Sequence, residues 1–207
     1  MGDAAYNTKV KISGVSTAMT SQAMTLVSGN TYQINSTARR VWNPDGTFAF
    51  TDLGSTIAAS NISSIDYLFG KVTFATGKTT VALASGTYLP VANVLGAQSY
   101  TLNLGRALLD DTDFTSTGWI SRIPGLLDAS VSITRWDDLD TDFIDMLEDP
   151  ASVIVVDITP GGESLIARGF FRLESDNLSG DVAALQSNEL SFALDGGITG
   201  KNFSFST

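Results

Sequence analysis

The sequence consists largely of short segments in which apolar and polar residues alternate, separated by turn-forming residues. Alternation with a period of two puts successive side chains on opposite faces of an extended chain, so it predicts half-buried β-strands. The segments 47–51, 98–104 and 190–194 show the pattern clearly. Residues that favour turns occur together at 43–46 (NPDG) and 159–162 (TPGG), so both segments are predicted to be turns. Many short strands joined by such turns favour an antiparallel sandwich or barrel.

One segment has a helical pattern instead. Residues 141–148 bring Phe143, Ile144 and Leu147 to one side of a helix. Aspartates lie before this segment and in its first turn, where they suit the helix dipole, and Pro150 ends it. The fold class predicted from the sequence is therefore mainly β, an antiparallel β-sandwich or barrel with one flanking α-helix.

The predicted strands fall into two groups. We expect an N-terminal β-rich block at 1–95, which either belongs to the same fold as the rest or forms an outer, stacking element. The core sandwich is expected at 96–200 and contains the helix at 141–148. Residues 201–207 are expected to form a C-terminal tail, because their alternating residues have no evident partner strand.

The composition excludes most catalytic chemistry. The 207 residues include no His and no Cys, so a Ser-His-Asp triad, a thiol nucleophile and a cysteine metal site are impossible. The glycine motifs that bind nucleotides are absent. Carboxylates are plentiful, but no spacing singles out a pair of the kind that a glycosidase uses. We therefore expect a structural or assembly protein that is not an enzyme and has no cofactor.

The net charge of −10 is unevenly distributed. Residues 1–100 carry six basic and four acidic residues, a balance of +2, whereas residues 101–207 carry six basic and eighteen acidic residues, a balance of −12. A protein that grips DNA needs a basic patch that displaces counterions from phosphates. The sequence lacks such a patch and is compatible with a protein past which DNA slides.

The surface predicted from the composition is weakly charged. Charged residues make up 16% of the chain, compared with about 25% in an ordinary soluble domain. Burial against neighbouring copies favours such a surface, and so does the Ser- and Thr-rich composition of strands. No secretory signal is evident, and no apolar run approaches the roughly 18 residues of a membrane span. We expect a chain that folds in a cytoplasm and has no membrane partner.

Acidic and aromatic residues cluster in a predicted polar loop at 107–124. Asp110, Asp111 and Asp113 have a spacing that suits Ca²⁺, although the EF-hand pattern is not met, and a solvated acidic loop is the alternative. Trp119 lies in the same loop and is the tryptophan best placed to contact a neighbouring subunit. The other tryptophans, Trp42 and Trp136, suit either core packing or a sugar-binding platform.

Several local stretches resemble the tail tube proteins of long-tailed bacteriophages. The stretch 125–136 (GLLDASVSITRW) resembles their central strand, and the acid-rich helix follows it. The later stretches that carry the resemblance are 153–158, 167–176 (ARGFFRLESD), 178–182 and 189–196 (ELSFALDG), where the last strand ends at a glycine. The first block resembles the same family more loosely, at 39–44 and 65–74.

The resemblance implies a β-sandwich with a flanking helix, of which six copies close into a ring. Rings stack into a tail tube, and DNA leaves the capsid through its lumen. The implied partners are further copies of the chain, the terminator, tape-measure and tip proteins of the tail, and double-stranded DNA that passes without specific binding. The implied location is the virion tail, assembled in the cytoplasm of a bacterial host. Closure of a ring of sheets also removes exposed strand edges.

Two sets of residues are candidates for roles in such a tube. An acidic lumen repels phosphates and eases the passage of DNA. The loop at 107–124 is expected to be the stacking element and to become ordered on assembly. The candidates for contacts between subunits or stacked rings are Asp110, Asp111, Asp113, Phe114, Trp119, Arg122, Arg39 and Arg40. The candidates for acids that face the lumen are Asp157, Glu174, Asp176, Asp181 and Glu189.

Three other classes of protein fit parts of the sequence. A tail terminator, a head–tail connector or a decoration protein has the same general architecture. A carbohydrate-binding or adhesin-like β-sandwich needs an exposed aromatic platform. A hydrolase that uses paired acids is the last alternative, and nothing in the spacing of the acids supports it.

Overall fold

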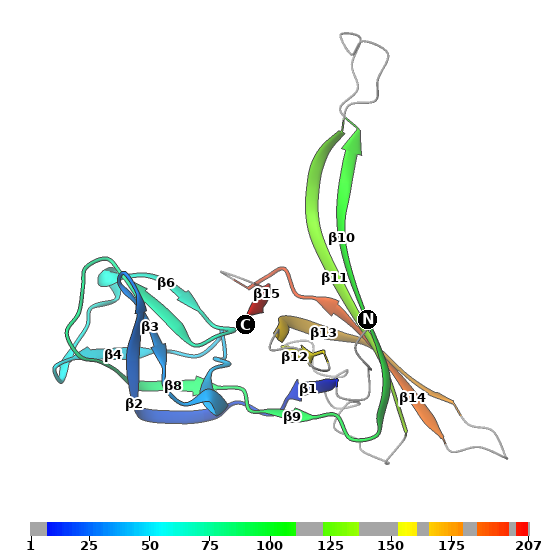
Figure 1. Ribbon diagram of the computed structural model, residues 1–207, viewed down its shortest axis with the longest axis horizontal. Helices are drawn as coiled ribbons and strands as arrows, with labels where there is room; N and C mark the ends of the chain where they lie inside the picture. Colours follow the sequence, from blue (N-terminus) through cyan, green and yellow to red (C-terminus); the bar gives the residue numbers. More distant parts are fainter. Residues whose placement is uncertain are drawn as a thin grey trace, which may run out of the picture. The chain divides into compact units, whose positions relative to one another are not determined.

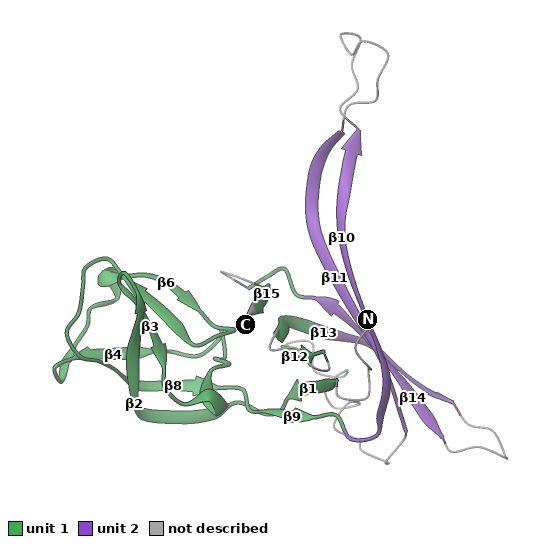
Figure 2. Cartoon of the chain, viewed as in Figure 1, with its two compact units in different colours: residues 1–94, 153–171, 195–207 green, residues 95–152, 172–194 purple. Residues whose placement is uncertain are grey.

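The chain divides into two compact units (Figure 2). Unit 1 contains residues 1–94, 153–171 and 195–207, and unit 2 contains residues 95–152 and 172–194. The chain therefore passes between the units four times. The computed structural model describes residues 8–110, 122–136, 153–160, 166–179, 186–198 and 202–206.

Unit 1 contains a seven-stranded antiparallel sheet that is formed entirely by residues between Thr17 and Tyr88 (Figure 1). Its strand order is β5-β4-β8-β2-β3-β7-β6. The long strand β2 pairs with β8 through its first half and with β3 through its second half. The bounds of the elements are β2 (Thr17–Ser28), β3 (Thr31–Ile34), η2 (Thr37–Arg39), β4 (Ala49–Asp52), β5 (Ser55–Thr56), η3 (Ala59–Asn61), β6 (Ile62–Asp66), β7 (Lys71–Phe74) and β8 (Val81–Tyr88).

An apolar core lies inside this sheet. It forms because every second residue of the strands points inward, as at Val72 and Phe74 in β7 and at Val81 and Leu83 in β8. Trp42 stacks on Phe48 at 5.0 Å between ring centroids and lies 5.9 Å from Phe50, so aromatic rings run through the core. Each fully buried side chain of this size contributes about 2–3 kcal/mol.

The other sheet of the chain has eight strands, which belong to both units. Its part in unit 1, which we call the second sheet of unit 1, has the strand order β9-β1-β12-β13. Its strands are β1 (Lys9–Ser13), β9 (Val91–Asn93), β12 (Ile154–Thr159) and β13 (Ile166–Ser179), of which β13 continues into unit 2 after residue 171. Residues 154–158 of β12 are all buried, which explains why this strand is a continuous apolar run with one aspartate.

The C-terminal strand β15 (Phe203–Ser206) pairs with the start of β13 in unit 1. The sequence shows alternation here but no partner, and the structure supplies the partner. A Cβ atom at Gly169 would lie 2.7 Å from Cδ2 of Phe203, so the absence of a side chain at Gly169 makes the close approach possible. Phe203 also packs edge-to-face on Phe171, at 6.3 Å between ring centroids.

The part of the eight-stranded sheet that belongs to unit 2 has the strand order β10-β11-β14-β13. Its strands are β10 (Ala97–Asp110), β11 (Arg122–Trp136), β14 (Ser187–Leu194) and the second half of β13. Val131 and Ile133 of β11 are fully buried, and they lie opposite Phe192 and Leu190 of β14. These residues form the apolar face of the sheet.

The mainly β, antiparallel class predicted from the sequence is confirmed. The predicted helix at 141–148 lies outside the described residues and is not confirmed. Within the described part of the chain, the search for a helix long and apolar enough to cross a membrane finds none.

Candidate assembly interface

Strands β10 and β11 are longer than the sheet that supports them (Figure 1). The two strands pair along their whole length, from Ala97 to Asp110, whereas β14 pairs with β11 only from Ser130 onward. Residues 104–110 and 122–129, which we call the ribbon, therefore have only each other as strand partners among the described residues. A two-stranded ribbon is marginally stable alone in water, so this one needs further support.

Apolar side chains of the ribbon are in contact with water. Their exposed fractions run from 46% to 86%. Single exposed apolar residues are common on protein surfaces, whereas a group of them along one segment marks a binding surface. The residues are Leu104, Leu108, Leu109, Ile123, Leu126 and Leu127.

The apolar face of unit 2 continues onto the ribbon. Directly opposite residues of an antiparallel pair share one face of the sheet. Leu102 lies opposite Val131 on the apolar face, and the next pairs on that face are Leu104 with Ala129 and Arg106 with Leu127. The register of the strands thus puts Leu104 and Leu127 on the apolar face of the sheet, where core residues lie. The side chains of both residues are nevertheless exposed to solvent. A further protein surface is needed to bury them.

A β-bulge shapes the ribbon. The register shifts between Arg106 and Leu108, where Leu127 and Pro124 are the successive partners on β11. Gly125 lies at this shift, and a Cβ atom there would be 3.0 Å from the carbonyl oxygen of Ala107. The glycine therefore permits the close approach of the two strands that the bulge requires.

Two of the residues predicted to contact other subunits meet at the far end of the ribbon. Asp110 and Arg122 are the last pair in the described register of β10 and β11. Opposite charges at facing positions stabilise a strand pair by about 0.2–1 kcal/mol. Four further residues predicted for the same role, Asp111, Asp113, Phe114 and Trp119, lie outside the described residues.

The predicted contact residues Arg39 and Arg40 belong to unit 1. The guanidinium carbon of Arg39 lies 5.7 Å from the centroid of the Tyr88 ring. Arg40 follows η2 and is half-buried. Trp42 is completely buried and donates a hydrogen bond from Nε1 to the carbonyl oxygen of Arg39 at 3.0 Å, so it is a core residue and not part of a sugar-binding platform.

The second face of the unit 2 sheet carries short hydroxyl side chains. Ser130, Ser132 and Thr134 alternate with the buried residues of β11. Their partners on β10 and β14 share the face, and none of them is basic. We call this surface the hydroxyl face; it consists of Ser99, Thr101, Asn103, Ser130, Ser132, Thr134, Glu189, Ser191 and Ala193.

The acids predicted to face a lumen lie in different environments. Glu189 is exposed on the hydroxyl face, opposite Thr134. In the unit 2 part of β13, Glu174 is exposed and Asp176 is half-buried. Asp181 lies outside the described residues.

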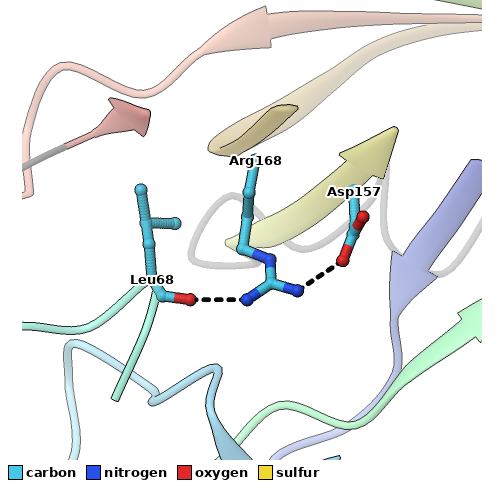
Figure 3. Close-up of polar contacts among 3 residues, drawn as sticks. All are labelled: Leu68, Asp157 and Arg168. Atoms are coloured by element: carbon cyan, nitrogen blue, oxygen red, sulfur yellow. Dashed lines mark hydrogen bonds and ion pairs between the residues drawn. The ribbon is translucent and has the colours of Figure 1, made fainter. Parts of the chain in front are cut away.

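The interpretation of Asp157 is corrected by the structure. This residue is only 1% exposed and lies within unit 1. Nη2 of Arg168 donates to its Oδ2 at 2.5 Å, and Nη1 of Arg168 donates to the carbonyl oxygen of Leu68 at 2.8 Å (Figure 3). The guanidinium carbon also lies 5.1 Å from the centroid of the Phe69 ring. Asp157 is therefore a structural acid and not a surface acid.

One phenol in unit 1 has a perturbed acidity. Burial raises the pKa of Tyr67 above its ordinary value, because the phenolate is poorly solvated there. Tyr67 packs against Phe48 at 5.8 Å between ring centroids. Groups of three or more acids that could hold a metal ion do not occur among the described residues.

The charge of the chain segregates by unit. Unit 1 contains eight basic and seven acidic residues, a balance of +1, whereas unit 2 contains four basic and fifteen acidic residues, a balance of −11. The contrast that the sequence shows between its two halves is thus also a contrast between the residues assigned to the two units. Nearly all of the net negative charge belongs to the unit that carries the ribbon and the hydroxyl face.

No protein-family model matches the sequence, and no curated protein matches it. Two of the solved structures that resemble the chain come from gene transfer agent particles. A chain in the virion of a native particle aligns with a TM-score of 0.47 and 20% identity, covering 56% of this chain and 89% of that chain. A chain in the tail of an empty particle aligns with a TM-score of 0.46 and 22% identity, covering 57% of this chain and 87% of that chain.

Proposed function

We propose that the chain is a structural subunit of a phage-like tail, whose copies join into rings that stack into a DNA-conducting tube. The observation that carries the proposal is the ribbon, on which core positions such as Leu104 and Leu127 stay exposed in the single chain. Exposed apolar surface of this kind is typical of a site that another protein covers. The local resemblance to tail tube proteins at 125–136, which includes part of the ribbon, supports the same proposal.

Ring formation uses the free edge of β10. Among the described residues this strand is the last one in its sheet, and it offers 14 residues of backbone along that edge. It contains no proline and no lysine, and its first charged residue is Arg106. Proteins that stay monomeric protect long edges with such residues. An edge of this kind pairs with a strand of the next copy, and a head-to-tail contact whose rotation closes gives a ring.

Stacking of rings uses the ribbon. Its leucines and Ile123, which are exposed in the single chain, insert between copies of the adjacent ring. Their apolar side chains are buried there, and this burial stabilises the stack. Asp110 and Arg122 at its far end form polar contacts with the partner ring. The arginines Arg39 and Arg40 of unit 1 are the second candidates for such contacts.

The lumen is lined by unit 2. The hydroxyl face offers short, mostly uncharged side chains and includes Glu189, and the unit that carries it has a balance of −11. A wall of this kind has few cations to bind phosphates, so it does not hold passing DNA. Glu174 and Asp176 are the further candidates for lumen acids, together with Asp181.

Electron microscopy of the purified full-length protein tests the proposal. Concentrated protein viewed in negative stain is expected to form long hollow tubes, together with rings at lower concentration. A monomer at every concentration would contradict the proposal, and single rings that never stack would favour a tail terminator.

Two variants test whether tube formation depends on the ribbon. The double variant Leu126→Ser/Leu127→Ser is expected to fold and to form no tubes, since it removes apolar area from the ribbon. Leu53→Ser is the matched control, because Leu53 is 70% exposed and lies in unit 1. Equal tube formation by both variants would show that the ribbon is not the stacking surface.

A further inference from the structure

The chain leaves and rejoins the second sheet of unit 1 at a single place. β1 and β9 are antiparallel neighbours, and Ser13 pairs with Val91 at the end of their register. The backbone N–H of Gly14 donates to the carbonyl oxygen of Pro90 at 2.8 Å. The two ends of the intervening segment, residues 15–89, are therefore side by side. Adjacent ends are the geometry of a domain that is inserted into a loop.

The segment 15–89 has its own sheet and its own core. All strands of the seven-stranded sheet lie within it. The core cluster that includes Trp42, Phe50 and Phe74 is also made only of residues from this segment. Its 75 residues exceed the roughly 60 residues at which single domains begin to fold alone.

The contacts that fasten the segment to β12 and β13 are few. Val41, Leu68, Phe69 and Leu89 share a small buried cluster with Val155 and Phe170. Arg168 donates to the carbonyl oxygen of Leu68 (Figure 3). Its guanidinium carbon also lies over the Phe69 ring. One apolar patch and one arginine thus hold the segment to the rest of unit 1 within the described residues.

We infer that residues 15–89 form an inserted module that folds as a separate cooperative unit and that assembly of the chain does not need. The second part of this inference rests on the proposed function. The features assigned first to rings and stacking, the β10 edge and the ribbon, lie in unit 2 and outside the module, which contains only the second candidates, Arg39 and Arg40. The module is then a part that every subunit carries for a role other than tube formation.

Hydrogen exchange of the full-length protein tests the first part. Phe50→Ala opens a cavity in the core of the module. Exchange is expected to become at least tenfold faster in β2–β8 and to stay unchanged in β11, β12 and β14. Ile133→Ala, in the core of unit 2, is the matched control and is expected to spare β2–β8. Faster exchange throughout the chain in either variant would overturn the inference of a separate unit.

A deletion tests the second part. Residues 15–89 are replaced by Asn-Gly, which closes β1 and β9 into a two-residue hairpin. Val155→Thr and Phe170→Thr are added because the module no longer covers these side chains. The shortened protein is expected to fold and to form tubes like those of the full-length chain.

The possible outcomes separate the two proposals. A shortened protein that fails to fold, or that folds and forms no tubes while the full-length chain does, would overturn the claim that the module is dispensable. If the full-length chain forms no tubes, the proposed function fails, and the exchange experiment still decides whether the module is a separate unit.

Discussion

Arg168 and Asp157 face each other across strands β13 and β12, and their side chains form an ion pair that is buried inside unit 1. The same guanidinium donates to the carbonyl oxygen of Leu68, so it ties the turn after β6 to the second sheet of unit 1 (Figure 3). Lys11 on β1 lies opposite Asp157 on its other side. Asp157 thus lies between two basic residues in the strand register, and removing it leaves the buried guanidinium of Arg168 without its counter-ion.

Removal of this aspartate is expected to destabilise the protein strongly. Asp157→Leu leaves the buried Arg168 without its counter-ion, a change that costs about 3–5 kcal/mol in comparable sites. The double variant Asp157→Leu/Arg168→Met replaces the pair by apolar groups and is expected to recover most of that loss. Urea unfolding of both variants checks the difference. A loss below about 1 kcal/mol in the single variant would contradict the role given to the pair.

The bulge of the ribbon is expected to depend on Gly125. Gly125→Val places a side chain against Ala107, whose carbonyl oxygen would lie 3.0 Å from the new Cβ atom. The strands must then separate, and we expect the concentration needed for tube formation, followed by light scattering, to rise at least tenfold. Gly105→Val is the control, since nothing lies within 4 Å of a Cβ atom there. An equal effect of the two changes would argue against a special role of the bulge.

Gly70 is expected to be essential to the fold of the inserted module. Its φ of +60° is unfavourable for other residues, and a Cβ atom would lie 2.8 Å from both the carbonyl oxygen of Arg40 and Cγ2 of Ile34. Gly70→Ala therefore combines a conformational cost of about 1–2 kcal/mol with a steric clash. Gly29→Ala, at φ +52° with nothing within 4 Å, has only the first cost. Thermal unfolding is expected to show the larger loss for Gly70→Ala, and equal losses would show that the clash relaxes.

The raised pKa of Tyr67 predicts a loss of stability in alkali. The folded protein holds the phenolic proton more tightly than the unfolded chain, whose pKa is the ordinary value of 10.0. This contribution is fully present below pH 10 and is lost as the pH rises through the folded-state pKa. Tyr67→Phe removes the titrating group, so its stability is expected to fall less between pH 9 and 11. Urea midpoints that fall in parallel for the two proteins would contradict this prediction.

The local pattern predicts the strands well where one face is buried and the other is wet. The alternation around Val131 and Ile133 identifies both the strand and its core residues, because the register cannot slip without exposing them. The pairing of β15 with β13 could not be predicted in this way. The pairing depends on the space that Gly169 leaves for Phe203, and Gly169 lies more than thirty residues earlier in the sequence. The alternation of apolar and polar residues identifies a strand but does not show which strand it pairs with.

The residues of the interface were only partly visible in the sequence. The sequence predicts a polar loop at 107–124, whereas β10 continues to Asp110 and β11 begins at Arg122. Leu108 and Leu109 before the acids, and Ile123 after them, were the signal that the strands extend. The role of Asp157 was hidden because its counter-ion, Arg168, comes from the next strand, and a single sequence does not show which charges meet.

The central claim is that another copy of the chain covers the ribbon, and thiol labelling tests it most directly. The chain has no Cys, so Leu127→Cys and Leu53→Cys each introduce a single reporter thiol at an exposed site. The rate of maleimide labelling is compared between dilute protein and the assembled state. We predict that Leu127→Cys is labelled at least tenfold more slowly after assembly, whereas Leu53→Cys is unaffected. Unchanged labelling of Leu127→Cys in assembled protein would contradict the claim.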